Sequence, residues 1–64
     1  MNSRPVDTTQ ILTLRECAQY LRVHYTTVCR LAHAGKIPCF KVGSDWRFMR
    51  DELQRWMKEQ EAKP

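Results

Sequence analysis

Two short helical patterns joined by only two residues are the feature that most restricts how this chain can fold. The first pattern begins with the capping box Thr13-Leu14-Arg15-Glu16 and ends near residues 21–22. The second runs over residues 25–34 and is followed by Gly35, which suits the left-handed position after a helix. Residues 23–24 alone connect the two patterns. Two helices joined by so tight a turn predict a helix-turn-helix.

The helix predicted over residues 25–34 has two unlike faces. At about 100° per residue, its small aliphatic side chains gather on one side of the helical wheel: Val28, Leu31 and Ala32. The opposite side carries hydroxyl, guanidinium and imidazole groups, from Thr26, Arg30 and His33. Thr27 and Cys29 flank these faces. We therefore expect the aliphatic side to be buried and the polar side to be exposed.

A β-hairpin should follow the second helix. Two strand-like runs, residues 37–42 and 46–49, flank the loop Gly43-Ser44-Asp45. Strand alternation assigns four apolar side chains to the core-facing sides, namely Phe40, Val42, Trp46 and Phe48. Lys41 and Arg47 then both fall on the exposed sides.

The last helical pattern begins near Arg50, with acidic residues in its first turn, where the helix dipole favours them. Its apolar stripe consists of Leu53, Trp56 and Met57. The polar sequence that follows predicts fraying. We therefore divide the chain into a flexible N-terminal arm at residues 1–11, one domain over residues 12–58 and a frayed C-terminal tail at residues 59–64.

The length of 64 residues allows only a small core, so apolar side chains are first assigned to it. The predicted core comprises Leu14, Ala18, Leu21, Val28, Leu31, Ile37, Phe40, Val42, Phe48, Leu53 and Trp56. A substrate pocket needs walls that so short a chain can hardly supply. No Ser-His-Asp or paired-carboxylate set appears at a suitable spacing either. We expect neither an enzyme nor a small-molecule substrate.

Charge is spread unevenly along the chain, whose formal net charge is +4. Residues 1–50 hold eight Lys or Arg against three acidic residues, whereas residues 51–64 hold three against four. A basic body suits a polyanionic partner such as nucleic acid, although a solubilising surface has the same composition.

Cys17, Cys29 and Cys39 lie inside apolar patterns rather than in a dense disulfide framework. This usage indicates reduced thiols and a cytoplasmic, nucleoid-associated protein, and no apolar run is long enough to suggest a membrane span. Cys29 and His33 are four residues apart, within reach of a shared metal, but structural zinc sites usually contain a close cysteine pair. We expect no metal and no cofactor, with a metal-responsive sensor as a distant alternative.

The polar face of the second helix suits the major groove of B-DNA, which is wide enough to admit a helix. Arg30 has the reach to bind guanine O6 and N7 together, and Thr26 is the second residue expected to read bases. Four further residues are expected to hold phosphates: Tyr25, Thr27, Lys41 and Arg47. Purely structural roles are open for the same residues, because threonines cap helices and cations on edge strands discourage edge pairing.

Four segments carry a more specific signal: TLxExAxYL, VxxxTVxRL, GKIPxFKVG and WRFxxxELxxW, in this order between Leu12 and Met57. Together they resemble the DNA-binding domain of the excisionase family, a MerR-like winged helix-turn-helix. The resemblance implies a mainly α fold with a small β-hairpin, in the order α-α-β-β-α. It implies that the recognition helix, residues 25–34, enters the major groove and that the hairpin wing, residues 37–49, lies over the backbone or minor groove. The DNA-binding positions that it implies are Tyr25, Thr26, Thr27, Arg30, Lys41, Gly43, Ser44 and Arg47.

The chain departs from this family pattern at three places. Ser44 and Asp45 occupy the tip of the wing, where relatives often carry Arg or Lys, and an aspartate near phosphates is repelled. His24 stands where a Ser or Asp cap is common, so the start of the second helix should be less well capped. Tyr25 stands where a basic residue is frequent. These departures predict weaker or differently specific binding on the same fold.

The expected function is double-stranded DNA binding of the excisionase or transcriptional-regulator type. Further copies of the chain on adjacent sites, or a recombinase, are the expected protein partners. The alternative is a protein-interaction module that docks a recombinase or a transcription component through the C-terminal helix. An exposed Trp46 or Trp56 would favour that alternative.

Overall fold

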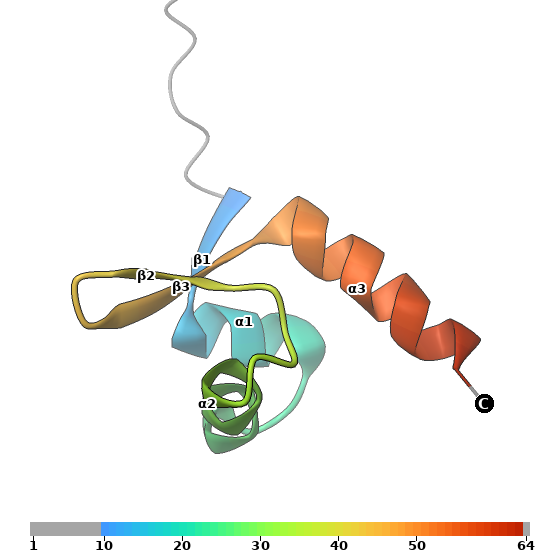
Figure 1. Cartoon of the computed structure of the whole chain (residues 1–64), viewed down its shortest axis with the longest axis horizontal. Coiled ribbons are helices and arrows are strands. Elements are labelled where there is room, and N and C mark those ends of the chain that lie inside the picture. Colours follow the sequence, from blue (N-terminus) through green and yellow to red (C-terminus); the bar gives the residue numbers. More distant parts are fainter. Residues whose placement is uncertain (1–9, 64) are drawn as a thin grey trace, which may run out of the picture.

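The computed structural model describes residues 10–63, which form three helices and a three-stranded antiparallel sheet (Figure 1). In chain order the elements are β1 (Ile11–Thr13), α1 (Leu14–Leu21), α2 (Tyr25–His33), β2 (Phe40–Val42), β3 (Asp45–Met49) and α3 (Arg50–Ala62). The strand order in the sheet is β1-β3-β2. The predicted winged helix-turn-helix is confirmed, with one strand in addition.

The additional strand is β1, which pairs with β3 through Ile11 and Met49, Leu12 and Phe48, and Thr13 and Arg47. The sequence pattern places Ile11 in an arm, whereas the structure places it in the sheet. A run of three residues is too short to show a strand period, so only its pairing with β3 identifies it. Of the arm expected at residues 1–11, residues 1–9 lie outside the described residues.

The capping box at the start of α1 is confirmed. The Glu16 N–H donates to Thr13 Oγ1 at 3.1 Å, and the Thr13 N–H donates to Glu16 Oε1 at 2.9 Å. At the other end, Arg22 takes a left-handed conformation, with φ 61°, and its N–H donates to the Gln19 carbonyl. This reversal ends α1 where predicted and allows α2 to begin three residues later.

The start of α2 is capped by a histidine. The Thr26 N–H donates to His24 Nδ1 at 3.3 Å, and the Thr26 hydroxyl lies 2.9 Å from the same nitrogen. This single backbone N–H bond is longer than the two bonds of the capping box on α1, so the structure gives α2 a side-chain cap without contradicting the expectation of a poorer one. Gly35 has φ 69°, which confirms the predicted left-handed residue after the helix.

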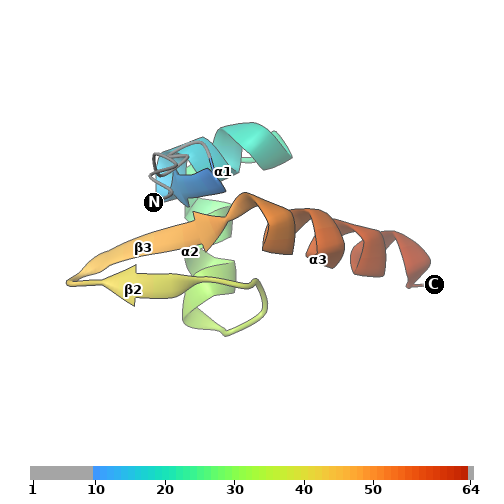
Figure 2. The same cartoon turned by 90° about the horizontal axis from the view of Figure 1, so that it is seen from above.

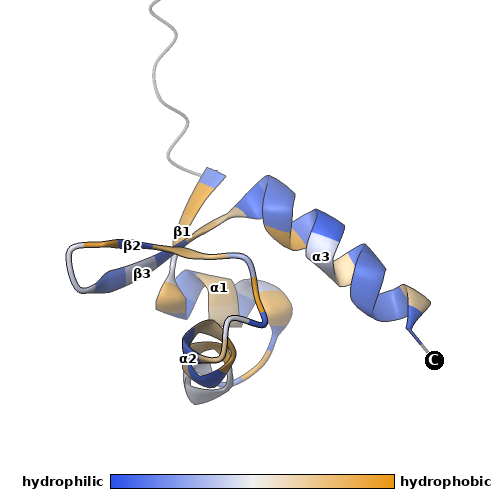
Figure 3. Cartoon of the chain, in the orientation of Figure 1, coloured by the Kyte–Doolittle hydropathy of each residue, from blue (hydrophilic) through white to orange (hydrophobic). Residues whose placement is uncertain are grey.

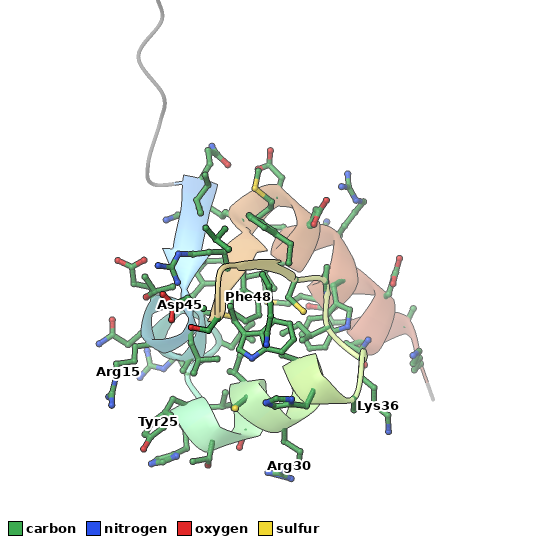
Figure 4. All side chains as sticks on the ribbon, turned by 60° about the vertical axis from the view of Figure 1, so that its left-hand side comes forward. Arg15, Tyr25, Arg30, Lys36, Asp45 and Phe48 are labelled. Carbon is green, nitrogen blue, oxygen red and sulfur yellow. The ribbon has the colours of Figure 1, made fainter. Side chains whose placement is uncertain are left out.

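The core lies between one face of the sheet and the helices α1 and α2, and Phe48 stands at its centre (Figure 4). The buried side chains are Leu12, Cys17, Ala18, Val28, Ala32, Ile37, Phe48 and Leu53. Several residues predicted as core are only partly buried around this cluster, namely Leu14, Leu21, Leu31 and Trp56. A domain with so few fully buried side chains has little stability to lose.

The register of the hairpin differs from the predicted one and moves two apolar side chains out of the core. Phe40 pairs with Arg47, and Val42 pairs with Asp45. Directly opposed residues of an antiparallel pair share a face. Phe40 and Val42 therefore lie with Arg47 on the outer face of the sheet, where they are 38% and 57% exposed. The prediction that they belong to the core is wrong.

Loop length explains this error. The sequence pattern predicts a three-residue loop, but Asp45 is the first residue of β3, and only Gly43 and Ser44 remain in the turn. Gly43 has φ 65°, as the first position of a type II′ turn requires. Because side chains alternate with a period of two, a loop shorter by one residue exchanges the faces of one strand relative to the other.

α3 continues to Ala62, well into the segment predicted to fray. The hairpin and α3 extend in opposite directions from the body of the domain (Figures 1 and 2). The side chain of Trp56 ties α3 to the chain after α2, since its indole N–H donates to the Lys36 carbonyl at 2.9 Å. The last turns of α3 are exposed and mostly hydrophilic (Figure 3). No described helix is both long and apolar enough to cross a membrane.

Candidate nucleic-acid interface

The outer surface of α2 is polar, and no other element between residues 10 and 63 covers it. Thr26 and Arg30 are exposed, whereas Val28 and Ala32 are buried on the opposite side of the same helix. Arg30 points away from the body of the domain (Figure 4). Thr27 lies at the boundary and is half-buried. The predicted two-faced character of this helix is confirmed.

An aromatic stack stands at the start of α2. The Tyr25 ring lies on the His24 ring, with centroids 4.7 Å apart and an angle of 28° between the planes. The guanidinium carbon of Arg15, from α1, lies 4.5 Å from the centroid of the Tyr25 ring. Tyr25 therefore packs against α1 through its ring. The residue is nevertheless 38% exposed, so it can both pack and contact a ligand.

A second aromatic contact joins the other end of α2 to the wing. His33 meets the Trp46 ring edge-on, with centroids 5.4 Å apart, and Lys41 Nζ lies 4.8 Å from the centroid of the same ring. Lys41 is the direct partner of Trp46 across the hairpin, so both belong to the sheet face that turns toward α2. The ammonium group of Lys41 is thus held on the α2 side of the hairpin.

Arg47 lies on the opposite face of the hairpin. Its Nη1 donates to the Trp46 carbonyl at 2.8 Å, and its Nη2 lies 4.0 Å from Asp45 Oδ2. Since the Asp45 carboxylate is 70% exposed, this ion pair contributes at most about 1 kcal/mol. Asp45 is the only ionic partner recorded for Arg47 within residues 10–63. Its negative charge nevertheless weakens the attraction of the Arg47 guanidinium group for phosphates.

The structure therefore divides the predicted site residues. Thr26 and Arg30 share the exposed surface of α2, whereas Tyr25 packs against α1 and the half-buried Thr27 lines a hollow on the side of α3. Lys41 lies on the sheet face that turns toward α2. Gly43 and Ser44 form the exposed turn at the tip of the wing. Arg47 lies opposite Phe48 as predicted, whereas Lys41 lies on the Trp46 side of the sheet, contrary to the expectation that both wing cations lie on the outer face. The two-residue turn is the physical reason, because it exchanges the strand faces.

Sequence reasoning missed Arg15 as a neighbour of α2. In the sequence it is an ordinary polar residue in the first turn of α1, ten positions before Tyr25. Their contact depends on the crossing of α1 and α2, which neither helical pattern specifies. Trp46 is a similar case, since its predicted role was core packing, whereas the partly buried ring also contacts His33 and Lys41.

The thiols next to this region are shielded. Burial raises the pKa of Cys17 from 9.0 to about 12, and the nearby Cys39 thiol adds to the shift. Burial also raises the pKa of Cys39. All three cysteines are free. Among residues 10–63, no group of three or more His, Cys, Asp or Glu side chains is arranged to hold a metal ion.

The raised pKa of Cys17 makes stability depend on pH under alkaline conditions. The pKa of the Cys17 thiol is 9.0 in the unfolded chain and about 12 in the folded chain. The buried thiol therefore contributes its full stabilisation of the fold below pH 9, and this stabilisation is lost as the pH rises from 9 toward 12. We expect the free energy of unfolding to fall by about 1 kcal/mol as the pH rises from about 9 to about 10. Urea denaturation under reducing conditions measures it. Cys17→Ala should show a smaller fall, and an equal fall would assign the effect to other groups.

An apolar hollow lies between the ends of α1 and α2 and the middle of α3. Its apolar lining comes from Leu21, Val23, Leu31, Trp56 and Met57. Trp46 and Trp56 are both only partly buried. This hollow lies on the α3 side of the domain, and Thr27 of α2 also lines it, whereas the exposed Thr26 and Arg30 do not.

Known proteins share this domain. A family model described as a helix-turn-helix domain matches residues 11–61. Two proteins of Mycobacterium tuberculosis, one from each of two strains, are 46% identical to the chain over 39 residues, and their names describe candidate DNA-binding proteins. The match covers 61% of this chain and 50% of each relative, so the chain spans about half the length of those relatives. No solved structure is significantly similar to it.

The family match begins with β1 and ends one residue before the end of α3, so it covers all six elements described above. It agrees with the tight turn between α1 and α2, with the hairpin that follows and with the four sequence segments that resemble excisionase domains. The chain therefore belongs to the excisionase-like family of helix-turn-helix domains.

Proposed function

We propose that this chain binds double-stranded DNA by placing α2 in the major groove. The observation that carries the proposal is the exposure of Thr26 and Arg30 on a helix whose opposite side is buried. A helix held in this way presents donors to base edges without exposing apolar surface. The names of the mycobacterial relatives support the same partner. The chain acts in this role as a binding protein rather than as an enzyme.

Within this proposal Arg30 and Thr26 read bases, and Tyr25 and Thr27 hold phosphates. Lys41 holds a phosphate beside the groove, because Trp46 keeps its ammonium group on the α2 side of the wing. Gly43 and Ser44 bring the wing tip close to the backbone. Arg47 is the weakest member of the proposed set, since it faces the other way and lies beside Asp45.

The decisive experiment is selection of bound duplexes from a random pool, followed by sequencing. Enrichment of a common motif would support base reading by α2, and two or more copies of the motif at a fixed spacing would support several chains on adjacent sites. If no duplex were recovered above background at low salt, the proposal of DNA binding would be wrong. The regulated process is proposed to be excisive recombination or transcription control in the bacterial nucleoid, and the genomic position of the motif distinguishes these two.

The salt dependence of binding tests the wing. Replacing Lys41 by alanine should flatten the slope of log K against log salt concentration by about one unit, because one phosphate contact and its released counterion are lost. Fluorescence anisotropy of a labelled duplex at several salt concentrations measures this slope. Lys58→Ala is the matched control, since Lys58 is an exposed lysine on α3. A Lys41→Ala slope equal to that of the control would exclude Lys41 from the interface.

Docking of a protein partner through the C-terminal helix remains the second proposal. The apolar hollow beside Trp56 and Met57 favours it, because apolar surface on a small domain often marks a contact site. The indole N–H of Trp56 is already used within the chain, so the contact would rest on the apolar part of the side chain. Retention of duplex binding in Met57→Ala, together with loss of a recombinase or polymerase contact, would separate the two roles.

A further inference from the structure

The first helix brings a positive charge to the start of the recognition helix. Arg15 is exposed, and its guanidinium group rests on the face of the Tyr25 ring at 4.5 Å. Tyr25 in turn rests on His24, whose Nδ1 accepts from the Thr26 N–H and so caps α2. Contacts therefore run from Arg15 on α1, through the rings of Tyr25 and His24, to the backbone N–H of Thr26 at the start of α2.

The charge of Arg15 is not neutralised within the described part of the chain. Between residues 10 and 63 the structure records no ion pair for Arg15, and the adjacent Glu16 carboxylate accepts from the Thr13 N–H instead. A ring contact uses the flat face of the guanidinium group and leaves its N–H donors at the edge. Within residues 10–63 the guanidinium group is therefore left without an opposite charge, and its N–H donors remain at the edge of the ring contact, where a ligand can reach them.

The position of Arg15 complements that of Lys41. Arg15, Tyr25 and Arg30 lie along one side of the domain, with Tyr25 between the two arginines (Figure 4). Lys41 is held near the opposite end of α2 through Trp46 and His33. A helix inserted in the major groove has a phosphate backbone on each side, and cations beside both ends of the helix would meet both of them.

We propose that Arg15 is a phosphate-binding residue of the DNA interface and that Tyr25 positions it there. This inference rests on the proposed insertion of α2 into the major groove. The ligand is the phosphodiester backbone, which a planar guanidinium group binds with two parallel hydrogen bonds. Tyr25 restricts the side chain before binding, so less conformational freedom is lost when the contact forms. α1 supplies the cation, and the aromatic residue at position 25 places it at the end of α2.

The test compares the salt dependence of duplex binding in single variants of the 64-residue chain. With a mixed-sequence duplex as the probe, Arg15→Ala should reduce the slope of log K against log salt concentration by about 0.9. Arg55→Ala removes the same charge from an exposed position on α3 and should leave the slope unchanged. If Arg15 had only a structural role, Arg15→Ala would lower the stability of the fold without changing the slope. Thermal unfolding is therefore measured on each variant. Equal slopes for Arg15→Ala and Arg55→Ala would overturn the inference.

The positioning role of Tyr25 needs a double-mutant cycle. Tyr25→Phe removes the hydroxyl proposed to hold a phosphate but keeps the ring, so Arg15→Ala should weaken binding by the same factor in this background as in the unmodified chain. In a Tyr25→Ala background, Arg15→Ala should weaken binding by a smaller factor than in the unmodified chain. An equal factor in the Tyr25→Ala background and in the unmodified chain would overturn the role of Tyr25.

The inference and the proposed function fail in different ways. Absence of duplex binding by the unmodified chain at low salt would contradict the proposed function itself. Binding that is steep in salt and weakened by Lys41→Ala, but unchanged by Arg15→Ala, would contradict only the role of Arg15.

Discussion

Phe48→Ala is expected to unfold the domain and abolish duplex binding. Phe48 is fully buried in the central strand of the sheet, opposite Leu12 and at the centre of the core. Truncation of a buried phenylalanine to alanine costs about 3–5 kcal/mol. Native domains have about 0.05–0.15 kcal/mol of stability per residue, so a chain of this size has only about 3–10 kcal/mol in total. Urea denaturation followed by circular dichroism measures the loss.

Phe40→Ala is the matched control for that experiment. Phe40 is chemically the same residue in the neighbouring strand, but the two-residue turn places it on the outer face of the sheet. Its truncation should cost much less than that of Phe48, on the order of 1 kcal/mol or below. Similar losses for the two variants would contradict the register of β2 on β3 and return Phe40 to the core.

Arg30→Ala is expected to weaken binding to the preferred duplex by about 1–3 kcal/mol and to relax base preference at one position. The side chain is exposed on the outer surface of α2, so the substitution should leave the fold intact. The measurement compares the affinities of the unmodified and variant chains for the selected duplex and for duplexes changed at single positions. Arg55→Ala, on α3, is the control for a general effect of lost charge.

The pattern of the losses identifies the contact that Arg30 makes. A base contact predicts that the variant loses affinity for the preferred duplex and little for the duplex changed at the contacted position. If both duplexes lost affinity equally and the salt slope fell, Arg30 would bind a phosphate and the assignment of base reading to it would be wrong.

The helices of this domain could be predicted from sequence because their signals are local. The reciprocal hydrogen bonds of Thr13 and Glu16 involve residues three positions apart, and the reversal at Gly35 needs only one residue without a side chain. The exposed face of α2 likewise follows from a helical period within nine residues. The end of α3 was less predictable, since its polar last turns carry no stop signal before Ala62.

The hairpin and the interface depended on contacts that sequence spacing does not specify. The faces of Lys41 and Arg47 depend on whether the turn contains two or three residues, and either length is compatible with a glycine followed by two polar residues. The sequence assigned Lys41 and Arg47 to the two strands of the hairpin, but their division between two faces of the wing could not be foreseen.

The sequence alone determined a pair of helices joined by a tight turn, a polar outer surface on the second helix and a hairpin after it. Each of these follows from residues close together in the chain. Tertiary structure alone decided that Ile11 joins the sheet, that Phe40 is exposed and that Arg15 rests on Tyr25. Those outcomes depend on how distant elements pair and cross, and the free energy that selects one arrangement comes from the shared burial around Phe48.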